Sequence, residues 1–183
     1  MQLRLKPIVP MVSLLFVLSI SCSIAFDGPQ SEGSESKPSE PNTETPSPSE
    51  NWKQDFLMLV NDLRKSGCRC GNENMPPVAP LALDERLTQA AQIHADDMAK
   101  NKFFNHTGSD GSKVSDRANR VGFKWMNIGE NISAGYPNFQ GAFQGWKESP
   151  GHCKNMMGKA YEKMGVAHNG AKWVQTLGNP RGN

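Results

Sequence analysis

Residues 145–157 read GWKESPGHCKNMM and combine acid, imidazole and thiol side chains in one short segment. Glu148 and His152 stand four residues apart, with Pro150 between them. Because proline starts a new turn instead of continuing a helix, we expect these two side chains to lie near each other without sharing one continuous helix. Sites are commonly built at such ends of helices and strands, so the segment is a candidate site.

Two other segments carry the same residue types next to turn-forming residues. His106 lies in the run NHTG at 105–108, and Glu130 lies in the run GEN at 129–131. We call His106, Glu130, Glu148 and His152 the tetrad. Although its members are far apart in the sequence, we expect folding to gather them in one cleft that solvent can reach.

The tetrad has three possible roles: metal binding, acid–base catalysis or a structural hydrogen-bond network. Two neutral imidazoles can bind a divalent metal, zinc most naturally, through His106 and His152, with carboxylate and water completing the shell. Glu130 and Glu148 could instead act as the acid and base of a peptidase-like hydrolase if burial raised one pKa. In the third interpretation, hydrogen bonds from histidine to glutamate only join helices to a sheet.

No nucleophile accompanies these candidates in the sequence. Ser149 is better explained as a helix cap beside Pro150, and Cys68 or Cys70 would need a neighbouring base to act as a nucleophile. We therefore assign no catalytic residue. The glycines lack the spacing of a phosphate-binding loop, so a nucleotide cofactor has no support.

Apolar residues at helical spacing surround these motifs. The four predicted helices begin at Asn51, Asp84, Ser112 and Asn138 and end near Gly67, Asn101, Gly122 and Trp146. Strand patterns cover 128–134, 163–168 and 172–177, and the last two are separated by Asn169 and Gly170, a strong hairpin signal. The sequence therefore predicts an α+β fold with helices around a small antiparallel sheet.

Five segments, in this order, resemble the signatures of the CAP superfamily, also called SCP domains. They are FFNHTGSDGS at 103–112, GENI at 129–132, GWKESPGHCKNMM at 145–157, MGVA at 164–167 and WVQT at 173–176. This superfamily comprises cysteine-rich secretory proteins, insect antigen 5, plant pathogenesis-related proteins and many bacterial secreted proteins. The resemblance covers about 51–178 and looks closest to a bacterial branch.

The resemblance implies a three-layer α-β-α sandwich whose cleft holds two histidines and two acids. Carried over motif by motif, these are the tetrad residues already identified. A cysteine-rich tail like that of eukaryotic members does not follow the domain, which leaves ion-channel blocking without a basis. The family is functionally diverse, so the fold alone does not decide the function.

Four cysteines bear on the compartment and on covalent bonding. They are Cys22, Cys68, Cys70 and Cys153. Export permits disulfides, and a bridge from Cys153 to Cys68 or Cys70 would stabilise the fold by about 3 to 4 kcal/mol. A zinc site made of the last three cysteines lacks a fourth sulfur and the usual two-residue gap.

The N-terminal part predicts an exported protein. Residues 1–25 have the bases and short apolar core of an export signal. Cleavage before Cys22 would permit a lipid anchor, whereas cleavage after the small residues 23–25 would release a secreted protein. Residues 26–50 are rich in Ser, Pro and Glu and predict a disordered tether, followed by the CAP/SCP domain at 51–183.

Charge and apolar residues limit the partners. The formal net charge is +2, and basic residues are scattered rather than clustered, which argues against nucleic-acid binding. Tyr136, Phe139 and the pair Met156 and Met157 could wall a groove for a small lipid. We expect a monomeric, bacterial envelope or secreted module that binds a metal and a small lipid or an envelope protein. A hydrolase and a cell-surface structural or interaction protein remain the alternatives.

Overall fold

The computed structural model describes residues 51–182. The predicted export signal at 1–25, the predicted tether at 26–50 and the lipidation candidate Cys22 lie outside the described residues. None of the helices in the described part is long and apolar enough to cross a membrane.

A four-stranded sheet forms the middle of the fold. In spatial order its strands are β3 (Ala82–Leu83), β5 (Lys163–Asn169), β6 (Lys172–Pro180) and β4 (Trp125–Ala134). β5 and β6 form an antiparallel hairpin in which Gly170 and Ala171 make the turn. Gly170 has φ +53°, the left-handed conformation that such turns favour. The predicted hairpin is confirmed, and β3 adds a short parallel pair at the edge of the sheet.

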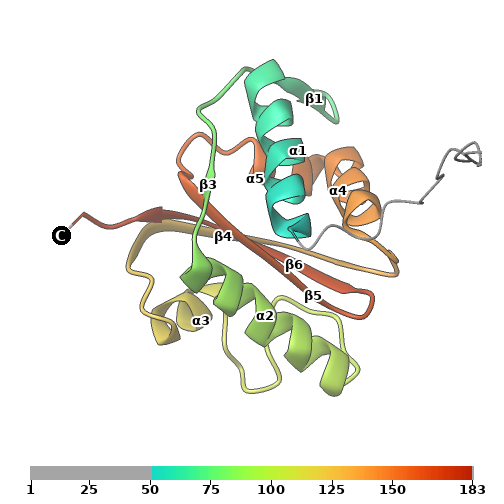
Figure 1. The fold of residues 1–183 in the computed structure, drawn as a ribbon, viewed down its shortest axis with the longest axis vertical. Coiled ribbons are helices and arrows are strands. Elements are labelled where there is room, and N and C mark those ends of the chain that lie inside the picture. The colour runs from blue at the N-terminus through green and yellow to red at the C-terminus, as the bar shows by residue number, and fades with distance from the viewer. Residues whose placement is uncertain (1–50, 183) are drawn as a thin grey trace, which may run out of the picture. The chain divides into compact units, whose positions relative to one another are not determined.

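Helices cover both faces of this sheet (Figure 1). On one face, α2 (Glu85–Lys100) packs on β5 and β6, and α3 (Val114–Arg120) lies beside α2. The other face carries α1 (Trp52–Ser66), α4 (Phe139–Glu148) and α5 (Pro150–Met156). The arrangement is the three-layer α-β-α sandwich of the α+β class that the sequence predicted.

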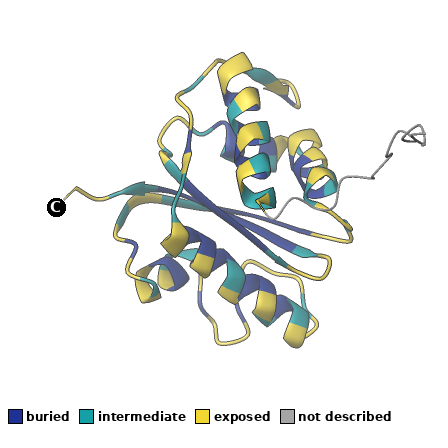
Figure 2. Ribbon diagram, in the orientation of Figure 1, coloured by how far each residue is buried: buried dark blue, intermediate teal, exposed yellow. Residues whose placement is uncertain are grey.

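The residues that face the interfaces between the helices and the sheet are buried (Figure 2), and most of these buried residues are apolar. On the side of α1, α4 and α5, the larger cluster includes Phe56, Trp146 and Met164. On the side of α2, small residues such as Ala91 pack against Val174 of β6. Large side chains thus fill one interface, and mainly small ones fill the other.

The contact between α2 and β5 is closest at Gly165. A Cβ atom built on Gly165 would lie 2.0 Å from the backbone nitrogen of Thr88 and 2.1 Å from the carbonyl carbon of Leu87. The backbones therefore touch there without an intervening side chain. Only glycine satisfies this position, and it fixes how deeply the start of α2 sits on the sheet.

Arg64, near the end of α1, is fully buried. Its guanidinium donates hydrogen bonds to the carbonyl oxygens of Ala79, Met156, Gly158 and Tyr161, at 2.8, 2.7, 3.1 and 3.3 Å. Burial lowers the pKa of Arg64 from its ordinary value. The carbonyl dipoles replace the water that an exposed guanidinium would have, so Arg64 joins α1 to two irregular segments.

Besides the unpredicted strand β3, the structure differs from the sequence-based expectations at the third helix, after α1 and at Pro150. The third helix begins at Val114, with Lys113 as its N-cap, instead of at Ser112. Two short strands, β1 (Cys68–Cys70) and β2 (Glu73–Met75), form a separate antiparallel ribbon after α1. The turn predicted at Pro150 is a full short helix, α5, because proline is well accommodated at the first helical position.

Candidate functional site

A pocket of about 480 Å³ lies where the loop after α2 meets β4 and the start of α5. Its lining residues are Phe104, Asn105, His106, Ile132, Ser133, Ala134, Tyr136 and His152. Two tetrad members, His106 and His152, thus face the same pocket although they come from different elements. The main expectation from the sequence was that folding brings these histidines into one cleft.

Glu130, a third tetrad member, lies behind His106. It stands on β4, and its side chain is only 3% exposed. Its Oε1 accepts a hydrogen bond from Nδ1 of His106 at 2.8 Å, and its Oε2 accepts one from Arg117 at 2.7 Å. Because a carboxylate only accepts, Nδ1 of His106 is the donor in this contact, and Nε2 is the ring nitrogen that the contact leaves unused. The side chain of His106 is 57% exposed, so this nitrogen is available to a ligand.

Arg117 of α3 completes this group from the buried side. Its guanidinium also donates to the carbonyl oxygens of Ser112 at 2.8 Å and His106 at 3.1 Å. Arg117 therefore holds both the carboxylate and the backbone of the histidine that the carboxylate orients. Arg117 was not among the residues predicted from the sequence, since an arginine in a short polar helix gives no sign that it is buried.

His94 of α2 lies beneath the same carboxylate. Its Nε2 donates to the carbonyl oxygen of Asn105 at 2.9 Å and lies 3.9 Å from Oε1 of Glu130. Burial lowers the pKa of His94, and the charge of Arg117 acts in the same direction, while the charge of Glu130 opposes them. His94 is thus a buried histidine that fixes the backbone before His106.

His152 enters the pocket from the first turn of α5. Burial lowers its pKa, and a positive charge on His106 would act in the same direction. A lowered pKa favours the neutral ring, the form that binds metals. Among the described residues, the ring of His152 has no hydrogen-bond partner.

Two asparagines fix α5 against β4. Asn131 donates to the carbonyl oxygen of His152 at 3.2 Å, and Asn155 donates to the carbonyl oxygen of Glu130 at 3.0 Å. Asn155 also donates to Oδ1 of Asn131 at 3.0 Å. These side chains were not singled out in the sequence, yet they set the spacing between the strand that carries Glu130 and the helix that carries His152.

Glu148, the fourth tetrad member, lies outside the lining of this pocket. It is the last residue of α4, is exposed, and accepts a hydrogen bond from Gln144 at 2.7 Å. Ser149, between α4 and α5, has extended backbone angles (φ −82°, ψ 119°), so the chain changes direction there. The structure therefore gathers His106, Glu130 and His152, and places Glu148 on the surface of α4.

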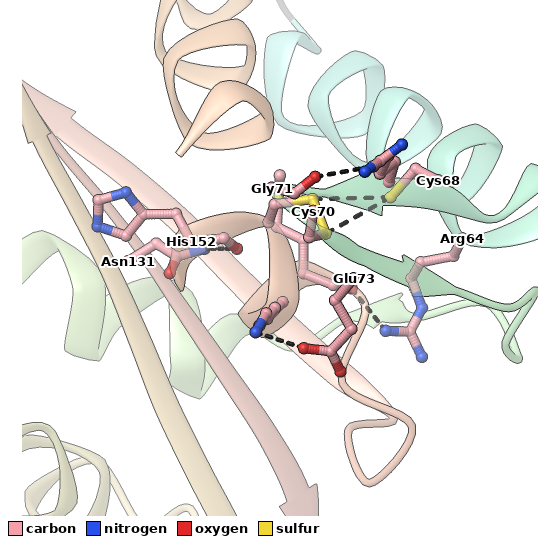
Figure 3. The surroundings of a disulfide bond; sticks show 11 residues. Arg64, Cys68, Cys70, Gly71, Glu73, Asn131 and His152 are labelled. Atoms are coloured by element: carbon pink, nitrogen blue, oxygen red, sulfur yellow. Dashed lines mark hydrogen bonds and ion pairs between the residues drawn. A yellow bond between two sulfur atoms is a disulfide. The ribbon is translucent and has the colours of Figure 1, made fainter. Parts of the chain in front are cut away.

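A disulfide joins Cys70 of β1 to Cys153 of α5 (Figure 3). The sequence left Cys68 and Cys70 as alternative partners of Cys153, and the structure selects Cys70. Cys68 keeps a free thiol and is half-buried. In Figure 3 the ring of His152 points away from the sulfur atoms, and no cysteine lines the pocket.

Comparisons with known proteins agree with this architecture. A relative is the uncharacterized protein YkwD of Bacillus subtilis, 29% identical over 98 residues that make up 52% of this chain and 38% of YkwD. A solved extracellular protein with an SCP domain from Bacillus anthracis superposes with a TM-score of 0.62 at 28% identity, over 69% of this chain and 40% of that one. The chain thus spans less than half the length of these two relatives.

An outer surface protein of Borrelia burgdorferi has the same fold, with a TM-score of 0.62 at 18% identity, over 74% of this chain and 96% of that one. The sequence profile of the cysteine-rich secretory protein family matches residues 57–176, more than half of this chain. The matched range contains the pocket, its two histidines and Glu130. The chain belongs to the cysteine-rich secretory protein family, the CAP family.

Proposed function

We propose that this chain is an exported binding module that holds a divalent metal ion, zinc, between His106 and His152. The observation that carries the proposal is that both imidazoles line one pocket of about 480 Å³. His106 offers Nε2, because Nδ1 donates to Glu130, and the lowered pKa of His152 keeps its ring neutral near pH 7. Two neutral imidazoles are donors that fit zinc well.

Glu130 serves this site as a positioning group. A carboxylate that accepts from the second nitrogen of a metal-binding histidine fixes the ring and raises its basicity. Arg117 in turn holds the carboxylate, since it donates to Oε2 at 2.7 Å. The site is therefore supported by a buried charge pair, and the imidazole is oriented before any metal arrives.

The walls of the pocket suggest what the metal would present to a ligand. Phe104, Ile132 and Tyr136 contribute apolar surface next to the histidines. Bound zinc would supply an electrophilic position for a carboxylate or carbonyl oxygen. A small lipid with such a head group, or an acidic side chain of an envelope protein, matches this combination of an apolar wall and a cationic centre.

The same contacts favour binding over hydrolysis. Both oxygens of Glu130 already accept hydrogen bonds from charged or polar partners, and Glu148 lies outside the pocket lining. A general base needs a free oxygen within reach of a substrate proton. Glu130 is only 3% exposed, and neither it nor Glu148 lines the pocket, whereas both imidazoles do.

Export agrees with the relatives and with the N-terminal sequence. The similar Bacillus anthracis protein is extracellular, and the Borrelia burgdorferi protein is an outer surface protein. The signal-like residues 1–25 predict the same compartment for this chain, either anchored through a lipid on Cys22 or secreted. Intact mass of the exported protein distinguishes the two forms.

Calorimetry with zinc tests the metal proposal. The oxidised full chain is titrated with zinc, beside the double variant His106→Ala/His152→Ala and the control His168→Ala, whose ring lies at the β5–β6 turn. We expect one zinc per chain in the wild type and the control, and at least tenfold weaker binding in the double variant. Equal heats in all three proteins would reject the proposal. Because the disulfide is intact in this experiment, the cysteines cannot supply a competing set of three thiolates.

A further inference from the structure

Three sulfur atoms meet between β1 and α5, away from the histidine pocket. Sγ of Cys68 lies 3.6 Å from Sγ of Cys153 and 3.7 Å from Sγ of Cys70 (Figure 3). In the described part of the chain, these are the one group of three metal-ligating side chains whose donor atoms all lie within 4.8 Å of one another. A free thiol packed against a disulfide needs a physical explanation.

The scaffold holds these sulfurs together by contacts other than the disulfide. Cys68 and Cys70 stand two residues apart on β1, and so face the same side of the strand. β1 pairs with β2, and Glu73 of β2 forms an ion pair with Lys154 of α5. When the disulfide opens, this pairing and the exposed ion pair still link β1 to α5 beside the three thiols.

The arrangement of the sulfurs argues against direct exchange within the cluster. Thiol–disulfide exchange proceeds through attack on one sulfur in line with the bond that breaks. In that geometry, the attacking sulfur lies close to one disulfide sulfur. Its distance to the other disulfide sulfur is longer by the length of a sulfur–sulfur bond, about 2 Å. The two distances from Cys68 differ by only 0.1 Å (3.7 minus 3.6 Å), so its sulfur lies beside the bond.

The same distances match the edges of a metal–thiolate shell. With zinc–sulfur bonds of about 2.3 Å and tetrahedral angles, two thiolates on one ion lie about 3.8 Å apart. Both distances from Cys68 are already close to this value. In a reduced chain, only the separation between Cys70 and Cys153 has to widen, from a covalent bond to the ordinary contact distance of two sulfurs.

The surroundings of Cys68 provide access and a favourable charge. Cys68 borders a pocket between α1 and α4 that is also lined by Phe143 and Lys147. Burial raises the pKa of the Cys68 thiol, and the charge of Lys147 opposes that shift. A positive charge beside the cluster offsets part of the negative charge of three thiolates, and the partial exposure of Cys68 leaves room for a fourth ligand.

We propose that Cys68, Cys70 and Cys153 form, in the reduced chain, a three-thiolate site for a thiophilic metal ion of the zinc or copper(I) kind, with one coordination position open. A dithiol reductant opens the disulfide: it gives up two electrons and two protons, becomes a disulfide itself, and leaves Cys70 and Cys153 as thiols. The metal then displaces the three thiol protons. Oxidation closes the site again, so the Cys70–Cys153 disulfide and the bound metal exclude each other.

Cadmium titration of the full chain, with the metal as a spectroscopic probe for zinc, tests the site. The protein is reduced without oxygen by a phosphine, which is oxidised to its oxide, and the sulfur-to-cadmium charge-transfer absorption is followed. We expect a band that saturates at one cadmium per chain in the reduced wild type and is absent from the oxidised protein. Reduced Cys68→Ser, which keeps the other two thiols of the cluster and Cys22, is expected to bind cadmium at least tenfold more weakly.

Two controls make the result decisive. The double variant His106→Ala/His152→Ala is expected to keep the band unchanged, so failure of the histidine proposal does not affect this test. Near-ultraviolet circular dichroism reports whether the reduced chain stays folded, and if reduction loosens it, cadmium is expected to restore the signal. No saturating band, no restoration, or equal affinity in Cys68→Ser would each overturn the site. A competition assay with a copper(I) chelator, run in the same way, distinguishes copper(I) from zinc as the preferred ion.

Discussion

The carboxylate of Glu130 and the guanidinium of Arg117 lie 2.7 Å apart, and both side chains are almost completely buried. This pair joins α3 to β4, while the second oxygen of Glu130 orients the ring of His106 in the pocket. The stability of the fold and the orientation of the site therefore depend on the same carboxylate. The free energy of unfolding and the binding of zinc at the pocket can be measured separately.

We expect Glu130→Gln to destabilise the protein by about 3 kcal/mol, because it leaves a buried guanidinium without its counter-charge. Urea unfolding at neutral pH measures this loss. The variant Arg117→Met and the double variant complete a mutant cycle in which the double change is expected to cost clearly less than the sum of the single changes. Additive losses would show that the two charges do not interact.

The lowered pKa of His94 predicts that the protein loses stability in acid. Its pKa is lowered in the folded protein, mainly by burial, whereas the unfolded chain takes up a proton near the ordinary value of 6.5. Below that value the unfolded state binds more protons than the folded state, so the free energy of unfolding falls as pH falls, by at most about 1.4 kcal/mol per pH unit.

Comparison with His94→Gln isolates this contribution, because His152 has a lowered pKa as well and adds to the slope in both proteins. Urea unfolding is measured between about pH 7 and about pH 5 with a chelator present, over the range in which an ordinary histidine titrates. The variant is expected to show a shallower decline than the wild type. Parallel curves would mean that His94 takes up its proton equally in both states.

Loss of Cys70 is expected to redirect the disulfide to Cys68. In Cys70→Ser the sulfurs of Cys68 and Cys153 remain 3.6 Å apart in the wild-type geometry, within easy reach of oxidation. Peptide mapping of the oxidised variant should find a Cys68–Cys153 bridge, with stability close to that of the wild type. Removing both Cys68 and Cys70 should cost about 4 kcal/mol, because the bridge spans 83 residues. Two free thiols in oxidised Cys70→Ser would contradict this expectation.

Gly165→Ala should be among the most damaging single-methyl changes in the protein. The added Cβ would meet the backbone of Thr88 at 2.0 Å, so α2 would have to move off β5. We expect a loss of about 3 kcal/mol or more, measured by chemical denaturation.

Gly151→Ala is the matched control for this change. Nothing lies within 4 Å of a Cβ at Gly151, which sits in the first turn of α5. Alanine is there expected to leave stability unchanged or to raise it by up to about 1 kcal/mol. If both glycine variants unfold at the same denaturant concentration, the close approach of α2 to β5 does not matter for stability.

Long periodic segments made most of the fold predictable. Four of the helices and the β5–β6 hairpin have clear apolar patterns, capping residues or turn residues. β1, β2 and β3 have two or three residues each, too few for any alternation to stand out. α5 begins with proline and glycine, which are typical of a turn in the sequence although the first turn of a helix tolerates both.

Residue type and position beside turns made three residues of the candidate site predictable. His106, Glu130 and His152 stood out as imidazole and carboxylate groups beside turns, and the structure brings them to one place. Arg117 did not stand out because its burial depends on the packing of α3 against β4, which no local pattern records. The position of Glu148 depends on the direction of the chain at Ser149, a single backbone conformation that the sequence does not specify.

The hydrogen bonds of Arg64 also determine how the protein can open. The guanidinium reaches the carbonyl groups of Ala79, of Met156 at the end of α5, and of Gly158 and Tyr161 in the irregular segment that follows. Neither the segment at 79 nor the segment at 156–161 can separate from the end of α1 without leaving a buried cation unsolvated. Local breathing of these loops is thereby coupled to unwinding of the helix, and in amide hydrogen exchange the three parts should behave as one cooperative unit.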